Sequence, residues 1–152
     1  MRLTRQSTYA IRTLIYCAVN DPGLSRIADI AKAHSISELF LFKLIKPLVE
    51  AGLLQTVRGR KGGIRLGRPA AEITLLDTIK LTEDSFAMAE CFEASGVDTI
   101  CPLADNCDLN GALREALNAF FDVLDSYTIA DLAGKRLSLR QRLGLESMLL
   151  AN

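Results

Sequence analysis

Residues 25–66 of the chain are SRIADIAKAHSISELFLFKLIKPLVEAGLLQTVRGRKGGIRL. Apolar residues recur at intervals of three and four over 27–33 and again over 38–51, which predicts two amphipathic helices. Residues 34–36 lack this period and predict a tight turn between the helices. Two short β-type runs within 53–66 flank a Gly-rich turn, which predicts a hairpin.

The second of these helices has clear start and stop signals. Ser25 and Ser37 are suited to cap the first and second helix, because their hydroxyls can accept a backbone hydrogen bond. Gly52 ends the second helix, and Pro47 predicts a kink because it removes one intrahelical bond. Its inward face consists of Leu41, Leu44, Ile45 and Leu48. Its outward face offers Leu39, Phe42, Lys43 and Lys46.

Further helices are predicted on both sides of this stretch. Residues 5–19 carry one apolar stripe, and Thr74 is suited to cap a helix that ends near Leu81. From Gly111 to Tyr127 a longer helix has apolar residues spaced 4, 3, 4 and 3 apart, which is a coiled-coil seam. The seam residues are Leu113, Leu117, Phe120, Leu124 and Tyr127. Such a seam predicts a homodimer interface, and the alternative is a core helix within one chain.

The charges are divided unevenly, although the 152 residues include 18 basic and 18 acidic side chains. Residues 1–70 hold 12 Lys and Arg against 4 Asp and Glu, a balance of +8. Residues 71–152 hold the remaining 6 and 14, a balance of −8. A basic half joined to an acidic half predicts a part that binds nucleic acid and a part with another role. Ordinary solvated charge is the alternative.

Three helices followed by a basic hairpin have the layout of a winged helix-turn-helix, whose second motif helix enters the major groove of DNA. The residues expected to reach base edges are Ser37, Leu39, Phe42 and Lys43. The cations at the tip of the wing are Arg58, Arg60 and Lys61, which suit the backbone or the minor groove. Phe42 either contacts a thymine methyl group or packs against the wing or the first helix.

Three of the four cysteines lie between residues 85 and 110, where the helical period is absent. Cys91, Cys101 and Cys107 have the spacing C-x9-C-x5-C, which lacks the close cysteine pairs of structural zinc sites. Iron–sulfur clusters accept wider spacing, and three thiolates leave one iron open to attack, as suits a sensor. A thiol switch and a zinc site are the alternatives. Cys17, beside the apolar stripe of the first helix, is expected to be a small buried side chain.

We expect a mainly α fold in three parts. These are a winged helix-turn-helix DNA-binding domain with a two-stranded wing at 1–70, a cysteine-rich cluster loop with a long dimerisation helix at 71–133, and a weakly ordered C-terminal tail at 134–152. No apolar run approaches the roughly 18 residues of a membrane span, and the N-terminus lacks a secretion signal. A cytoplasmic protein is therefore expected.

Several stretches together resemble one known family over about residues 1–133. They are Met1-Arg2-Leu3-Thr4, the turn around Ile36-Ser37, TVRGRKGG at 56–63, and a three-cysteine loop before a long helix. On these motifs the chain resembles the iron–sulfur winged-helix regulators of the Rrf-two family, which includes IscR, NsrR and CymR. Residues 37–43, 82–94 and 116–121 look most like its RirA-like branch of rhizobial iron regulators.

The resemblance implies a homodimer that binds a pseudo-palindromic operator on double-stranded DNA. It matches Cys91, Cys101 and Cys107 to the ligands of an iron–sulfur cluster, expected to be [4Fe-4S], and Arg58 to the wing arginine that enters the minor groove. The fourth ligand stays open. Positions that supply it in other branches hold Thr8 and Asn110 here. The candidates are Asp98, Asp105, Asp108, water and a small thiol.

The sequence thus predicts an iron-responsive transcriptional repressor whose operator affinity depends on the bound cluster. The alternative is a regulator of the same fold that responds to thiol oxidation or to nitric oxide. A redox enzyme or cluster carrier is disfavoured, because the chain has no nucleophile–base pair, Gly-rich phosphate loop or C-x-x-C motif.

Overall fold

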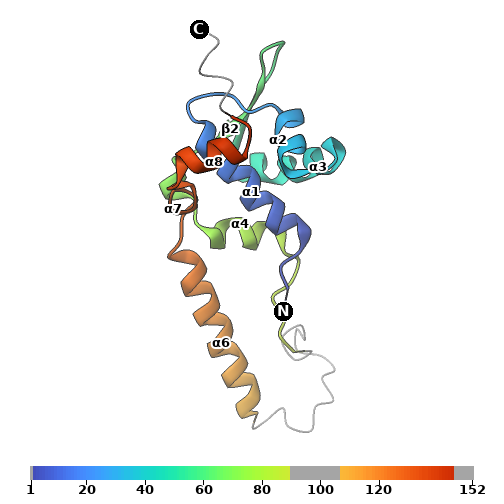
Figure 1. Ribbon diagram of the computed structural model, residues 1–152. Coiled ribbons are helices and arrows are strands. Elements are labelled where there is room, and N and C mark those ends of the chain that lie inside the picture. Colours follow the sequence, from blue (N-terminus) through green and yellow to red (C-terminus); the bar gives the residue numbers. More distant parts are fainter. Residues whose placement is uncertain (1, 90–106, 146–152) are drawn as a thin grey trace.

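The computed structural model describes residues 2–89 and 107–145, which form a mainly helical chain with a small antiparallel sheet (Figure 1). The elements are α1 (Arg5–Asn20), α2 (Ile27–His34), α3 (Glu38–Glu50), β1 (Leu54–Val57), β2 (Gly63–Leu66), the short 3₁₀ helix η1 (Ala70–Glu72), α4 (Leu75–Thr82), α6 (Asp108–Asp125), α7 (Ile129–Ala133) and α8 (Arg136–Arg142). The expected mainly α fold with a two-stranded wing is confirmed.

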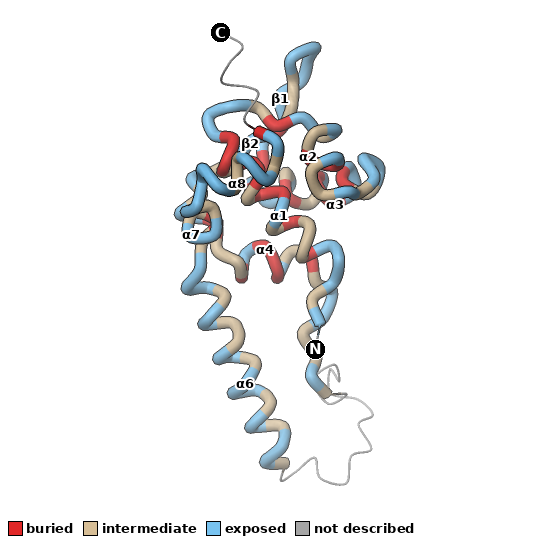
Figure 2. The backbone as a smooth tube through the Cα atoms, viewed as in Figure 1, coloured by how far each residue is buried: buried red, intermediate tan, exposed pale blue. Residues whose placement is uncertain are grey.

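Helix α1 runs through the centre of the molecule and organises the core. It packs against α3, α4, α7 and β2, and the buried residues gather around it (Figure 2). Its apolar stripe places Ala10, Leu14 and Val19 at zero exposure, and α3 adds Leu41 and Leu48. Burial of each of these leucine and valine side chains contributes about 1.5–3 kcal/mol. The first helix is therefore the scaffold on which the helix-turn-helix is held.

Local backbone signals close the helix-turn-helix. The Ser37 hydroxyl accepts a hydrogen bond from the Phe40 amide at 3.2 Å, so Ser37 caps α3 as predicted. Ser35 ends α2 in the left-handed conformation, with φ 53°. Ser25 does not cap α2, contrary to the prediction from sequence. Its backbone pairs instead with Ile64 of β2 through two hydrogen bonds of 2.8 Å, which joins the hairpin to the helix pair.

The two strands of the hairpin pair antiparallel, from Leu54 opposite Leu66 to Val57 opposite Gly63. Gly63 lies so close to the preceding chain that a Cβ atom there would be 2.7 Å from the Ser25 carbonyl oxygen. A side chain at this position would force the strand away from the start of α2. The glycine therefore allows the wing to pack directly on the helix-turn-helix.

Helices α4 and α7 begin side by side, since Thr74 and Thr128 are bridge partners. Each of the two threonines forms a capping box, with Asp77 in α4 and with Asp131 in α7. In such a box the hydroxyl and the carboxylate satisfy backbone amides that a helix start leaves unpaired. The cap predicted at Thr74 is confirmed.

Residues 135–145 fold back onto α1, where the sequence predicts a weakly ordered tail. Arg140 Nη1 and Arg136 Nε both donate to the Val19 carbonyl, at 3.0 and 3.1 Å. Leu145 is only 1% exposed. The two arginines satisfy a carbonyl at the end of α1, where a helix leaves its last carbonyls unpaired. The predicted tail is wrong for residues 135–145, and residues 146–152 lie outside the described part of the chain.

Helix α6 extends away from the body formed by α1 to α4 (Figure 1). None of its 18 residues is buried, although its apolar stripe is broad. Its contacts with the described residues are mainly with α4. No described helix is both long and apolar enough to cross a membrane.

Candidate DNA-binding surface and cysteine site

The outward face of α3 is exposed as the sequence predicts. Leu39 and Phe42 are 68% and 54% exposed, and Ser37 and Lys43 are also exposed. Phe42 therefore offers about half of its side chain to a partner on this side of α3. Two large apolar side chains on the solvent side of this helix suit contacts with thymine methyl groups.

Phe40, which the sequence analysis assigned to neither face, joins α3 to α1. Its ring lies edge-on to the Tyr9 ring, with the centroids 5.7 Å apart. Tyr9 also meets His34 at the end of α2, with the centroids 6.5 Å apart. These aromatic contacts fix the start of α3 against the scaffold helix. The sequence signal for this contact is that Tyr9 and Phe40 are aromatic residues near the starts of two helices.

The wing carries its cations away from the body. Arg58, Arg60 and Lys61 are all exposed at the turn between the strands. Gly59 has φ 116°, a conformation that side chains rarely adopt, so the tip depends on this glycine. The wing therefore presents positive charge to a partner beside α3.

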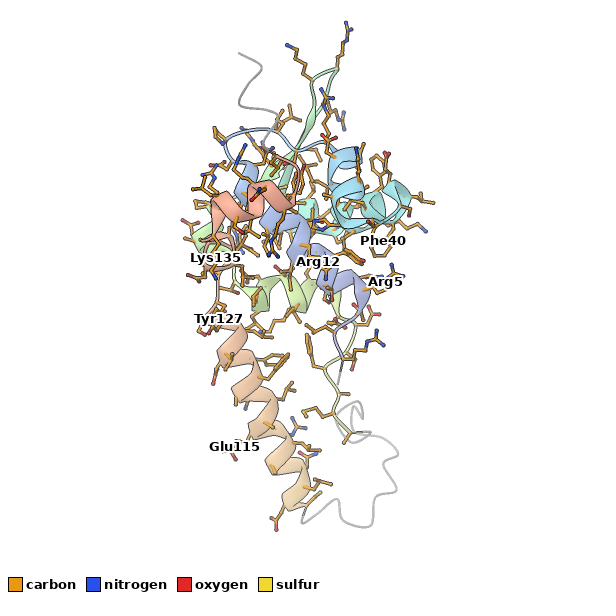
Figure 3. The ribbon with its side chains drawn as sticks, viewed as in Figure 1. Arg5, Arg12, Phe40, Glu115, Tyr127 and Lys135 are labelled. Carbon is orange, nitrogen blue, oxygen red and sulfur yellow. The ribbon has the colours of Figure 1, made fainter. Side chains whose placement is uncertain are left out.

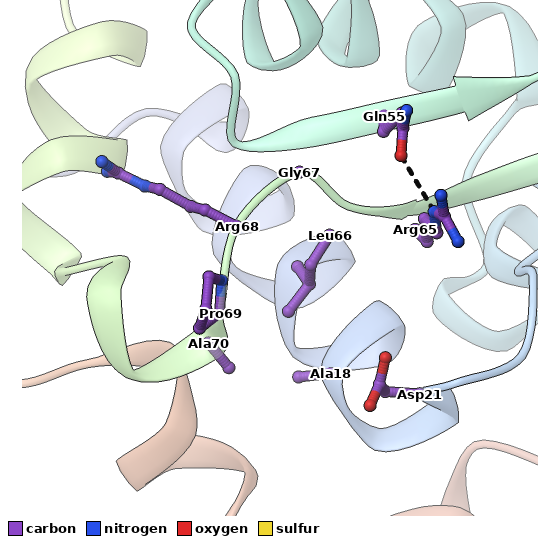
Figure 4. A pocket seen from close by; sticks show the side chains of 9 residues that line it. All are labelled: Ala18, Asp21, Gln55, Arg65, Leu66, Gly67, Arg68, Pro69 and Ala70. Atoms are coloured by element: carbon purple, nitrogen blue, oxygen red, sulfur yellow. Dashed lines mark hydrogen bonds between the residues drawn. The ribbon is translucent and has the colours of Figure 1, made fainter.

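A pocket lies at the base of the wing, between the strands and the end of α1 (Figure 4). Across it, Arg65 Nε donates to Gln55 Oε1 at 2.9 Å and ties the two strands together. Arg68 points away from the pocket and pairs with Asp77 of α4 at 2.6 Å. These contacts tie the two strands to each other and the end of the wing to α4.

Cys107 is the one predicted cluster ligand within the described residues. It is the N-cap of α6, and its Sγ accepts a hydrogen bond from the Asn110 amide at 3.4 Å. Cys91 and Cys101 lie outside the described residues. Within 2–89 and 107–145, no three His, Cys, Asp or Glu side chains are grouped to hold a metal ion. Cys17 is 2% exposed and burial raises its pKa to about 12, which confirms its prediction as a small buried side chain.

The segment that precedes Cys91 starts from a polar contact with α1, which the sequence analysis missed. Glu83 Oε1 accepts hydrogen bonds from the Thr4 amide, at 2.7 Å, and from the Ser7 hydroxyl. Ser7 Oγ also lies 2.7 Å from Thr82 Oγ1. Burial raises the pKa of Glu83, but the hydrogen bonds from Ser7 and Thr4 outweigh it and leave that pKa below its usual value. The partners are more than 70 residues apart, so no local pattern predicts this contact.

The predicted seam of α6 is half-buried along most of its length. Leu113, Leu117, Phe120 and Leu124 are partly covered, whereas Tyr127 lies beyond the helix end and is 50% exposed. The adjoining side of the helix is apolar and exposed. Its residues are Leu109, Ala112, Ala116, Ala119 and Val123. Much of the apolar surface of α6 is therefore left uncovered by the described part of the chain.

The exposed residues Ser37, Leu39, Phe42 and Lys43 form the reading face of α3. A helix-turn-helix with such a face and with a basic wing at its side defines the class of the protein. It is a winged helix-turn-helix, DNA-binding transcriptional regulator and not an enzyme. The Rrf2 family model, described as an iron-dependent transcriptional regulator, matches residues 3–135. The chain therefore belongs to the Rrf2, or Rrf-two, family.

Relatives and solved structures agree with this family. Protein aau3 of Rhizobium meliloti (strain 1021) is 63% identical over 146 residues, which cover 96% of this chain and 94% of that protein. The HTH-type transcriptional regulator NsrR of Geobacillus kaustophilus is 44% identical, over 94% of this chain and 97% of its own. The structure of CymR, the global cysteine regulator of B. subtilis, has a TM-score of 0.69 at 30% identity and covers 88% of this chain and 97% of its own.

Proposed function

We propose that this chain is an iron-responsive transcriptional repressor whose operator affinity depends on an iron–sulfur cluster. The observation that carries the proposal is the position of the two ends of the cysteine segment. Glu83, at one end, is hydrogen-bonded to the start of α1, and Cys107, at the other, caps α6. A change in this segment therefore acts directly on the scaffold of the DNA-binding domain and on the helix proposed for the dimer.

Cys91, Cys101 and Cys107 would hold the cluster, with the fourth ligand still open. The position of Cys107 fits this role, because it caps α6 at the end of the cysteine segment. Its thiol is free and half-buried. A bound cluster, proposed to be [4Fe-4S], would supply a centre that is sensitive to iron supply and to oxidants. The iron-dependent description of the family supports this assignment.

The proposed DNA-binding surface consists of the reading face of α3 and the tip of the wing. Its residues are Ser37, Leu39, Phe42, Lys43, Arg58, Arg60 and Lys61. Two such surfaces in a homodimer would read a pseudo-palindromic operator, with half-sites about 34 Å apart. The interface would be built from the α6 seam together with its exposed apolar side. Residues 1–70 are thus proposed to bind DNA, and residues 71–133 to sense and to dimerise.

A chain of contacts links the cysteine segment to the reading face. Glu83 holds Thr4 and Ser7 at the start of α1, and Tyr9, on the next part of α1, packs on Phe40 of α3. A cluster bound by the segment after Glu83 would favour one position of α1, and with it one position of α3. A tenfold change in operator affinity needs only about 1.4 kcal/mol of such coupling.

The test is operator binding by protein purified without air, with and without iron and sulfide. The operator is first selected from random DNA with the loaded protein, and both forms are then titrated at one salt concentration. We expect the loaded form to bind at least about tenfold more tightly, as the coupling requires. Equal affinity of the two forms would remove the sensor function.

Two cysteine variants sharpen this experiment. Cys101→Ala should lose iron and sulfide and bind the operator like the apo protein. Cys17→Ala is the matched control, because Cys17 is buried in α1 and should leave the iron and sulfide content unchanged. Colourless wild-type protein whose DNA binding follows thiol oxidation would support a thiol switch in place of the cluster.

A further inference from the structure

Two arginines of α1 lie near the start of α3, the helix proposed to enter the major groove. They are outside the DNA-binding surface proposed above. The guanidinium carbon of Arg5 is 5.7 Å from the centre of the Tyr9 ring and 5.8 Å from the centre of the Phe40 ring. That of Arg12 is 5.1 Å from the Tyr9 ring. Figure 3 shows Arg5 and Phe40 close together at the same side of the molecule. The arginines therefore stack on aromatic rings next to α3.

The positive charges of these arginines are not neutralised within the described residues. The ion pairs in that part of the chain are Lys46 with Glu50 and Arg68 with Asp77. Arg5 and Arg12 are both exposed, and neither belongs to these pairs. A cation–π contact engages the face of the guanidinium and leaves its in-plane N–H donors available. Each arginine thus lies on an aromatic ring, and no described residue accepts a hydrogen bond from its guanidinium group.

The aromatic support beneath the arginines is itself held in position. Tyr9 lies against His34, and His34 lies against Tyr16 of α1 with centroids 6.3 Å apart. Tyr16 is 2% exposed, so this end of the stack is part of the core. The stack restricts the motion of the guanidinium groups, which lowers the entropy lost when they bind an anion.

The position of the arginines relative to α3 indicates which anion they bind, namely a phosphate group of the DNA backbone. The wing extends on one side of α3, and the start of α1 lies on the other side (Figure 1). A helix in the major groove lies between two phosphate backbones, because the groove is only about 12 Å wide. With α3 in the groove and the wing on one flank, the start of α1 faces the backbone on the opposite flank.

We infer that Arg5 and Arg12 bind the DNA phosphate backbone on the side of α3 away from the wing. This inference rests on the proposed placement of α3 in the major groove. The contacts position the recognition helix and do not read bases, since phosphate contacts carry no sequence information. Arg5 and Arg12 would strengthen binding to operator and to random DNA by the same factor.

The experiment measures the affinity of full-length protein for the selected operator and for random DNA over a range of salt concentrations. Arg5→Gln and Arg12→Gln should each weaken binding to both DNAs, by about three- to tenfold at 0.1 M salt. Each should also reduce the slope of log affinity against log salt by about 1.8, because the dimer loses one phosphate contact, worth about 0.9, in each of its two subunits. Arg5→Lys keeps the charge and should restore the slope. Lys135→Gln, on the far side of the molecule in Figure 3, is the control and should change neither quantity.

The outcomes separate this inference from the proposed function. Phe42→Ala and Arg58→Gln are measured in parallel, because they test the reading face and the wing. Suppose that Phe42→Ala and Arg58→Gln weaken binding, while Arg5→Gln and Arg12→Gln keep the wild-type affinity and salt dependence. The arginine contact is then overturned and the proposed function stands. If none of the four variants alters binding, the placement of α3 fails and the inference fails with it. A loss of slope in Arg5→Lys equal to that in Arg5→Gln would also overturn a role for the charge.

Discussion

His34 is the single histidine of the chain and lies in the aromatic stack that supports α3. Burial lowers its pKa from the ordinary value of 6.5, and the positive charge of Arg12 lowers it further. Nε2 of this ring is buried without a hydrogen-bond partner among the described residues. The neutral form of the ring therefore fits the folded state better than the charged form.

The free energy of unfolding should fall as the pH decreases from about 6.5. In this range His34 binds a proton in the unfolded state more readily than in the folded state. The slope is at most about 1.4 kcal/mol per pH unit, the limit for one proton. Urea unfolding at pH 7.5 and 5.5 measures it, and His34→Gln should flatten the difference between the two. An equal pH dependence in wild type and variant would show that His34 does not cause it.

Single-residue predictions succeeded where the determining contact is local. Ser37 caps a helix through a bond to Phe40, three positions away, and the inward face of α3 follows from its period. Ser25 has the same local signal but pairs with Ile64 on the hairpin. The hydrogen bond between Glu83 and Ser7 joins residues that are 76 positions apart, so no local pattern predicts it.

At the scale of elements, α6 presents an apolar side that the described residues leave uncovered. Val123 on that side is 57% exposed. Val123→Glu should therefore leave the monomer fold intact but weaken the proposed homodimer. Each substitution occurs twice in a twofold dimer. We expect the dimer dissociation constant to rise at least about tenfold, measured by sedimentation at several protein concentrations.

Asn118→Glu is the matched control for this variant. It adds the same charge to an exposed position on the polar side of α6 and should not change the dissociation constant. If Val123→Glu dimerises as tightly as Asn118→Glu, this side of α6 does not form the interface.

The elements with a strong period were predicted closely, and their ends less so. The sequence places the start of α6 at Gly111, but the helix begins at Asp108 because Cys107 caps it. It ends at Asp125 and not at Tyr127, because Thr128 starts a new capping box. The sequence did not predict helix α8. Leu137, near the start of this helix, is 85% exposed and so adds nothing to an apolar face. The arginines of α8 bond to Val19 at the distant end of α1, a contact that no local pattern indicates.

At the scale of the whole molecule, α8 ties the C-terminal part of the chain to the end of α1. Arg140 donates to Val19 on α1 and to Leu145, at 3.0 and 2.9 Å. Arg140→Ala should destabilise the protein by about 1.5–3 kcal/mol, as expected for hydrogen bonds from a charged donor. The melting temperature should fall by several degrees. Calorimetry of this variant and of Arg142→Ala is the test.

Arg142→Ala is the control for Arg140→Ala. Its side chain is exposed and makes no hydrogen bond or ion pair with the described residues. Equal melting temperatures in the two variants would mean that the contact between α8 and α1 contributes nothing to folding.

The division of the chain into a basic and an acidic half anticipated the DNA-binding part but not how the two parts meet. Helices α4 and α7 pack on α1, so the second half shares a core with the first. The candidate cluster ligands were chosen from spacing, and Cys91 and Cys101 lie outside the described residues. Coordination depends on how distant thiols meet in space, which spacing alone does not determine.

The buried thiol of Cys17 also gives the protein an internal probe of its own unfolding. Because its pKa is raised to about 12 and its side chain is 2% exposed, an alkylating reagent should modify it only after the core around α1 opens. The rate of that modification in native buffer then reports how often the scaffold of the DNA-binding domain comes apart. Comparing this rate with and without operator DNA would show whether the duplex holds the scaffold closed.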